Sequence, residues 1–186
     1  PVLNGISMSK YLDDAGTVPA SDTDWFDETT RTGIVQQYNV AVSNGSQKGS
    51  SYFSLGYYKN LGIIKTSDFE RFSARINTDY KLIGDKLTIG EHFTLNRTSE
   101  VQAPGGFLGN VLEFNPSLPV YNTKGEFAEP VKGYPDRENP VARLDRNKDN
   151  RYTYWRMFGD AFVNLNLFKG FNLRSTFGLD YSQKEQ

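Results

Sequence analysis

The chain contains no cysteine among its 186 residues. A disulfide framework and a thiolate metal site are therefore excluded. Histidine is nearly absent as well, since His92 is the single one. A zinc site or a histidine-based catalytic centre usually needs more imidazoles or thiolates than this chain has, so we expect His92 to be a hydrogen-bonded polar residue.

The chain also lacks any long hydrophobic run. A membrane-spanning helix needs roughly 18 or more consecutive apolar residues, and no such stretch occurs. A helical membrane protein is therefore excluded. The averages, 37% hydrophobic residues and a mean hydropathy of -0.58, do not exclude a β-barrel, whose membrane signal lies in alternation. The net charge is -1, which argues against a nucleic-acid partner because such a partner requires a concentrated basic face.

What the chain does have is alternation, most clearly over residues 71–82. Every even position there is apolar or threonine, and every odd position is polar or charged. A period of two is typical of a β-strand with one apolar and one polar face. The length of this stretch is typical of strands that cross an outer membrane in a barrel.

The same pattern recurs and predicts an all-β fold, an antiparallel meander of about six strands. The expected strands span about 36–43, 51–59, 69–82, 87–98, 152–167 and 171–182. The alternation predicts one face that holds Ile76, Val163 and Phe177 and an opposite face that holds Asn77, Asn164 and Thr176. Glu91 breaks the apolar face of the fourth strand.

The apolar faces of the last two strands both fall on odd residue numbers, and this parity constrains the turn between them. Residues that pair across an antiparallel hairpin point to the same face. We therefore expect a three-residue loop, 168–170, that pairs Leu167 with Phe171 and holds Gly170 in a left-handed conformation. Further along, Leu165 should oppose Leu173, Ala161 should oppose Phe177, and Asn164 should oppose Arg174.

Connections between the expected strands alternate in length. Short polar turns follow the first, third and fifth strands, whereas residues 1–35 and 99–150 form long connections. Outer-membrane barrels combine short periplasmic turns with long extracellular loops. We therefore interpret 1–35 as an extracellular segment and 36–186 as a partial β-barrel with an extracellular loop at 99–150.

A linked series of motifs carries a family resemblance over nearly the whole chain. The series comprises residues 23–28 (TDWFDE), 31–33, 38–48, 54–57, 62–65, 69–77, 115–121 and 139–142. Together these segments resemble the early barrel of the SusC/RagA family of TonB-dependent outer-membrane transporters.

The resemblance implies a 22-stranded barrel with an N-terminal plug in the outer membrane of a Gram-negative, Bacteroidetes-like cell. It also implies import of oligosaccharides or peptides with a SusD-like surface lipoprotein and energy from the TonB complex. The chain opens on Pro1 rather than Met and ends within an expected strand, so we interpret it as a fragment that lacks the plug. The sequence contains no phosphate loop, nucleophile elbow or metal cluster, so we expect neither enzymatic activity nor a cofactor.

Charged residues of the polar face are candidates for the lining of the barrel lumen. These residues are Arg75, Asp79, Arg156, Asp160 and Arg174. Residues 145–150 resemble the start of a calcium loop, but Asn150 stands where that loop requires glycine. We therefore expect neither a metal site nor a catalytic residue.

Aromatic residues in the 99–150 connection are the candidates for substrate contact, because aromatic faces stack on sugars and on peptide side chains. The four candidates are Phe107, Phe114, Tyr121 and Tyr134. Packing of these rings within the loop is the alternative interpretation. We also expect a short helix at about 109–114.

A second function remains open from the sequence, that of a soluble, secreted carbohydrate-binding β-sandwich. Such a domain also has alternating strands and aromatic loops. The two hypotheses differ in what covers the apolar face, because a sandwich requires a second sheet over it and a barrel exposes it to lipid.

Overall fold

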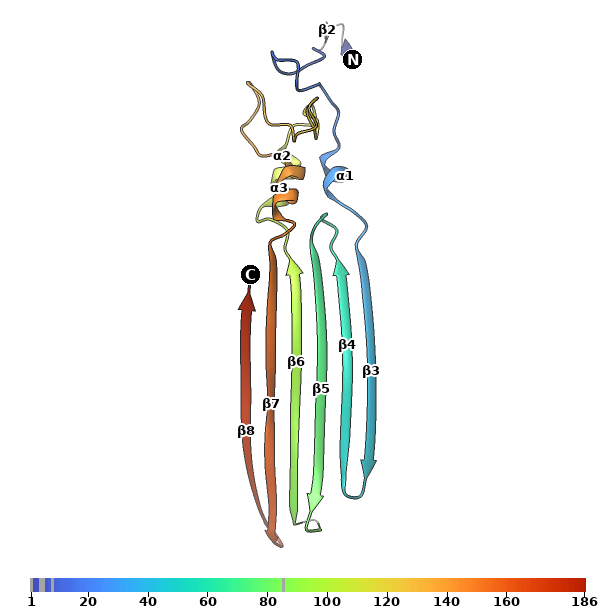
Figure 1. Cartoon of the computed structure of the whole chain (residues 1–186), viewed down its shortest axis with the longest axis vertical. Helices are drawn as coiled ribbons and strands as arrows, with labels where there is room; N and C mark the ends of the chain where they lie inside the picture. Colours follow the sequence, from blue (N-terminus) through green and yellow to red (C-terminus); the bar gives the residue numbers. More distant parts are fainter. Residues whose placement is uncertain (1, 4–5, 8, 85) are drawn as a thin grey trace. The chain divides into compact units, whose positions relative to one another are not determined.

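The computed structural model describes residues 2–3, 6–7, 9–84 and 86–186. Six strands form one sheet: β3 (Ile34–Ser46), β4 (Gly49–Leu61), β5 (Asp68–Leu82), β6 (Leu87–Val101), β7 (Arg151–Phe168) and β8 (Phe171–Glu185). Their order in the sheet follows their order in the sequence, and the pairs with a described register are antiparallel (Figure 1). The predicted six-stranded meander is confirmed, with each strand extending beyond its expected bounds.

Register places the apolar residues of the sheet on one face. Val40 pairs with Leu55, and Leu55 pairs with Ala74. Phe53 pairs with Ile76 in the same way. A shallow hollow of about 440 Å³ on this face is lined mainly by apolar side chains from β3 to β7: Val40, Val42, Phe53, Leu55, Ala74, Ile76, Phe93, Leu95 and Met157. One apolar surface therefore runs across these strands, as the alternation predicts.

This apolar face is exposed in the chain. Phe177, which pairs with Ala161, has 75% of its surface accessible, and Val40 is similarly open. Exposed apolar patches of this extent are unusual on a soluble monomer and indicate a surface that contacts lipid or another protein.

The turn between β7 and β8 differs from the prediction. Phe168, rather than Leu167, pairs with Phe171, so the loop contains only Lys169 and Gly170. A register shift between Asn166 and Phe168 leaves Leu167 unpaired, as in a β-bulge. This one-residue bulge keeps the apolar residues of both strands on one face, which the prediction had attributed to a three-residue loop. The predicted pairs from Leu165–Leu173 onward are correct, and Gly170 has a φ of 87°.

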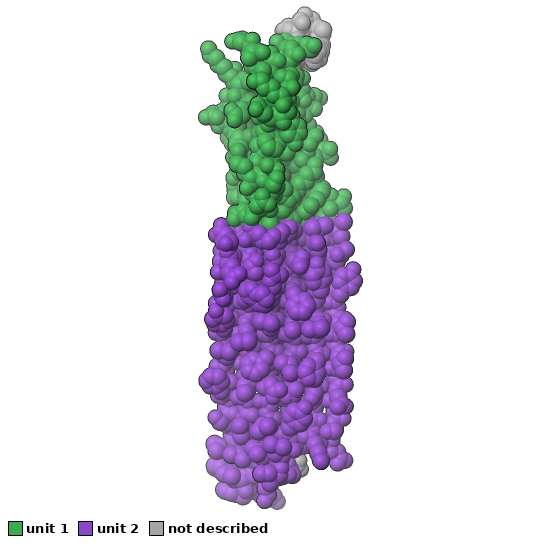
Figure 2. Space-filling model, viewed as in Figure 1, with its two compact units in different colours: residues 1–33, 62–67, 101–150 green, residues 34–61, 68–100, 151–186 purple. Residues whose placement is uncertain are grey.

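Three chain segments form a second compact unit, hereafter the loop unit: residues 1–33, 62–67 and 101–150 (Figure 2). It contains the paired strands β1 (Val2–Leu3) and β2 (Ile6–Ser7) and the helices α1 (Trp25–Thr29), α2 (Phe107–Glu113) and α3 (Pro140–Asn147). None of the helices that the structure describes is long and apolar enough to cross a bilayer. The expected helix at 109–114 corresponds to α2, which begins and ends slightly earlier.

Side-chain caps define where two of these helices begin. The Asp24 carboxylate accepts hydrogen bonds from the backbone amides of Phe26 and Asp27 at the start of α1. Asn139 caps α3 and also donates from Nδ2 to the carbonyl oxygens of Val120 and Ala128. Asn139 is buried with its side-chain amide fully engaged, so it fixes the helix against residues 120–128.

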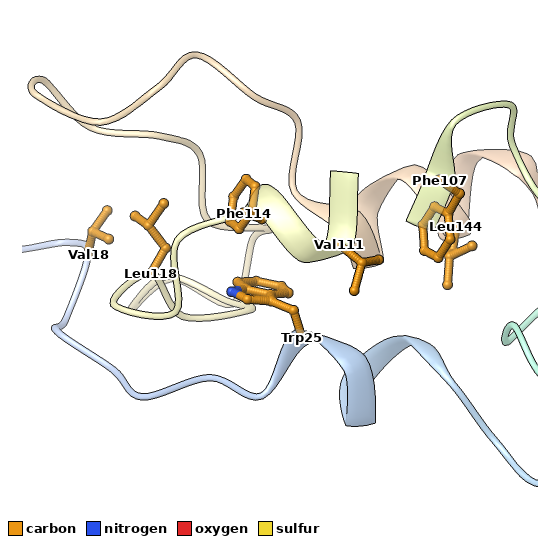
Figure 3. Packing of buried hydrophobic residues seen from close by; sticks show 7 residues of the cluster. All are labelled: Val18, Trp25, Phe107, Val111, Phe114, Leu118 and Leu144. Carbon is orange, nitrogen blue, oxygen red and sulfur yellow. The ribbon is translucent and has the colours of Figure 1, made fainter. Parts of the chain in front are cut away.

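The loop unit has its own hydrophobic core (Figure 3). Seven buried side chains from the separate segments form it: Val18, Trp25, Phe107, Val111, Phe114, Leu118 and Leu144. The rings of Trp25 and Phe114 meet edge to face with centroids 4.7 Å apart, and Trp25 Nε1 donates to the Asn115 carbonyl oxygen at 3.0 Å. Residues assigned from the sequence to separate long connections therefore fold together.

Candidate functional site

Charged side chains on the polar face of the sheet form specific pairs. Arg156 donates from Nε and Nη2 to the two carboxylate oxygens of Asp180, at 3.2 and 2.7 Å. His92 Nδ1 lies 3.3 Å from the Asp160 carboxylate. These neighbours on adjacent strands satisfy one another, which fits a structural wall of mixed charge better than an acid–base site.

An aromatic ring that the sequence analysis did not single out joins this wall. Phe162 stacks against the His92 ring with centroids 5.5 Å apart, and the Arg174 guanidinium lies 4.1 Å from the Phe162 centroid. A side chain at Gly90 would meet the Phe162 ring, since a Cβ there would lie 2.6 Å from it. The only sequence signal for Phe162 was its even position in β7, which it shares with Phe158 on the same face.

The remaining predicted polar-face residues have partners of other kinds. Arg75 Nε donates to Thr94 Oγ1 at 3.3 Å, and Asp79 accepts from the Ser50 hydroxyl at 2.5 Å. Arg75 and Asp160 line a common hollow with His92. Clusters of three or more side chains suited to a metal ion are absent from the described part of the chain.

Glu91 lies on the apolar face, as its odd position indicated. The hydroxyl of Thr78, a buried residue on the same face, donates to Glu91 Oε1 at 2.5 Å. The alternation of faces therefore continues through this position, and the carboxyl has a partner that reduces the cost of its apolar surroundings.

The four aromatic candidates in the loop unit have different environments. Phe107 and Phe114 are buried in the core, and Tyr134 packs against it, half-buried. Only Tyr121 is well exposed, at 51%, and it stacks on Phe127 with centroids 5.2 Å apart. Tyr121 is therefore the one candidate whose ring is accessible to a ligand in this conformation.

Phe127 also lines a polar hollow of about 960 Å³ within the loop unit. At one side of this hollow the Asp13 carboxylate accepts hydrogen bonds from the Thr17 hydroxyl and the Val18 amide. These bonds, that of Thr17 first, lower the pKa of Asp13 below its usual value. The hollow therefore adjoins the Tyr121–Phe127 pair. Sites that bind sugars or peptides commonly combine polar groups with an aromatic face in this way.

Comparison with known proteins identifies related chains over most of this sequence. No protein-family model matches it. TonB-dependent receptor P26 of Formosa agariphila is 28% identical over 178 residues, which cover 95% of this chain and 17% of the relative. TonB-dependent receptor SusC of Bacteroides thetaiotaomicron is 31% identical over 152 residues, which cover 81% of this chain and 15% of the relative.

The fold agrees with these relatives. The structure of the RagAB peptide importer in its closed-closed state superposes with a TM-score of 0.68 at 21% identity, covering 92% of this chain and 20% of that chain. The open-open state of the same importer gives a TM-score of 0.67 at 20% identity, covering 90% and 20% of the two chains. The chain is a segment of the SusC/RagA family of TonB-dependent receptors.

This SusC/RagA segment spans only 15% to 17% of the length of the two curated relatives described above. Its all-antiparallel sheet matches part of a TonB-dependent receptor barrel. Closure into 22 strands remains a prediction, as does the position of the polar-face residues within a lumen.

Proposed function

We propose that this segment forms part of the barrel wall of a TonB-dependent transporter in the outer membrane of a Bacteroidetes-like cell. Its apolar face would contact lipid, and Arg75, Asp79, Arg156, Asp160 and Arg174 would face the lumen. The exposed apolar surface across β3 to β7 carries this proposal. A β-sandwich would need a second sheet over that surface, and the other described sheet contains only two strands.

The proposed transporter imports oligosaccharides or peptides, and it is not an enzyme. Its proposed partners are the TonB complex, which would act through parts of the receptor outside this segment, and a SusD-like surface lipoprotein. A relative named TonB-dependent receptor SusC and a structural neighbour described as a peptide importer support this proposal.

Membrane orientation follows from the lengths of the connections. The turns after β3, β5 and β7 are short, whereas the loop unit supplies the connections at the other ends of the strands. Barrels place short turns in the periplasm and long loops outside the cell. The loop unit would therefore be extracellular and could contact substrate.

Single cysteines test this orientation directly, because the segment has no cysteine of its own. In intact cells, a membrane-impermeant maleimide should label Lys124→Cys, in the loop unit, but not Lys169→Cys, in the β7–β8 turn. Both lysines are exposed and lie in turns, so they form a matched pair. Labelling of Lys169→Cys before the outer membrane is permeabilised would contradict the proposed orientation.

Substrate contact is tested at Tyr121. Replacing Tyr121 with alanine should weaken binding of the transported oligosaccharide or peptide by about 1 kcal/mol, because a stacking ring is lost. Leu112→Ala, at an exposed apolar residue of α2 in the same unit, should leave binding unchanged. Equilibrium binding to the purified receptor measures both effects, and equal affinities for Tyr121→Ala and the wild type would remove Tyr121 from the substrate site.

A further inference from the structure

Arginines on the polar face fall into two groups. Arg156 has a carboxylate partner, Asp180. Arg71, Arg75 and Arg174 have none among the described residues. The Arg174 guanidinium lies over the Phe162 ring, the Arg71 guanidinium lies 5.6 Å from the Tyr58 ring centroid, and Arg75 donates one hydrogen bond to Thr94. Since a guanidinium has five N–H donors, most donors of Arg71 and Arg75 are left for another group.

Two carboxylates on the same face, Asp79 and Asp160, already have partners. Asp79 accepts from the Ser50 hydroxyl, and Asp160 lies against His92. Arg71 and Arg75 are four residues apart on β5, so they share a face at a Cα spacing of roughly 13 Å, with Ser73 between them. Neither side chain has a carboxylate partner among the described residues, and an anion bound between the two would supply the missing counter-charge.

A hollow of about 340 Å³ is lined by both Arg71 and Arg75. The other residues that line it are mostly neutral and polar: Asn39, Ser54, Ser73, Thr94, Asn96 and Phe158. Gly56 keeps this region open, because a Cβ there would lie 2.6 Å from Ser73 Oγ and 2.8 Å from Asn39 Oδ1. The hollow thus combines two cations with several amide and hydroxyl groups, and none of the described residues that line it is acidic.

We propose that Arg71 and Arg75 form an oxyanion-binding site that takes a carboxylate or sulfate group. The planar guanidinium matches such groups through paired N–H donors, and the side-chain amides of Asn39 and Asn96 can add hydrogen bonds. The anion is carried either by a transported ligand or by a part of the receptor outside this segment. The proposal rests on the proposed function only in placing this face toward the lumen.

The test compares a galacturonate hexamer with a galactose hexamer, which lacks the carboxylates. Both are bound to the full-length receptor, purified in detergent. If the site takes a ligand, the double variant Arg71→Gln/Arg75→Gln should lose about tenfold in affinity for the galacturonate hexamer and keep its affinity for the neutral hexamer. Arg156→Gln, at an arginine with its own carboxylate, should leave the ratio of the two affinities unchanged.

If the bound anion is instead a carboxylate from another part of the receptor, a different result is expected. The double glutamine variant should then lose heat-resistant gel mobility, and Arg71→Lys/Arg75→Lys should restore most of it because the cations are retained. If the glutamine variant changes neither the affinity ratio nor the heat resistance, the oxyanion site is refuted. Because binding and heat resistance are measured without transport, this failure is separable from a failure of the proposed transporter function.

Discussion

Replacing Trp25 with alanine should destabilise the loop unit by about 3–5 kcal/mol, the usual cost of truncating a buried aromatic side chain. Trp25 is only 4% exposed and lies at the centre of the core, in edge-to-face contact with Phe114 (Figure 3). The variant would also remove the donor to the Asn115 carbonyl oxygen. The lost contacts connect segments about 90 positions apart in the sequence. Their loss should therefore increase local unfolding throughout the loop unit.

Hydrogen exchange measured by mass spectrometry on the full-length receptor would quantify this effect. Backbone amides of α1 and α2 should exchange faster in Trp25→Ala than in the wild type. Phe26→Ala is the matched control, because Phe26 is the next residue of the same helix but is 55% exposed. Equal protection in Trp25→Ala and Phe26→Ala would show that the loop unit does not depend on this core.

An arginine at Val40 should destabilise the barrel by about 2–4 kcal/mol, the cost of a guanidinium facing lipid near the bilayer midplane. Val40 is the middle residue of β3 and pairs with Leu55 on the exposed apolar face. The proposed orientation places that face toward lipid, where water cannot solvate the charge.

The adjacent residue provides the control. Ala41 pairs with Ser54 on the polar face, so Ala41→Arg should cost less than Val40→Arg. Heat-dependent gel mobility of the two full-length variants compares their stabilities at the same strand and nearly the same depth. A larger loss for Ala41→Arg would reverse the assignment of the two faces.

The sheet could be predicted because the sequence of each strand alone shows which residues face which side. Alternation in a strand such as β5 specifies both faces from the sequence of that strand alone. Pairing parity then fixed the register at Leu165–Leu173, and it failed only next to the turn. A bulge at Leu167 and a longer loop satisfy the same parity, and nothing in the sequence distinguishes the two.

The loop unit could not be predicted in the same way, because its core is assembled from short segments without a shared period. Trp25, Phe107 and Leu144 belong to three different helices, none longer than eight residues. Apolar residues in such short segments show no periodicity, so the sequence could not distinguish a packed core from a ligand-binding loop. Phe107 and Phe114 were therefore candidates for substrate contact, whereas the structure places both inside the core.

The composite origin of the loop unit limits how its loops can be exchanged between receptors. Trp25 packs on Phe114, and Thr23 donates to the Leu118 carbonyl oxygen, so one graft cannot carry both halves of these contacts. In a chimera that receives only residues 101–150 from a relative, Val18 and Trp25 would pack against side chains that differ from their own partners in the core. Specificity in this part of the receptor should therefore diversify by coordinated change in several segments, and a successful loop transplant should include residues 9–33 and 62–67 as well.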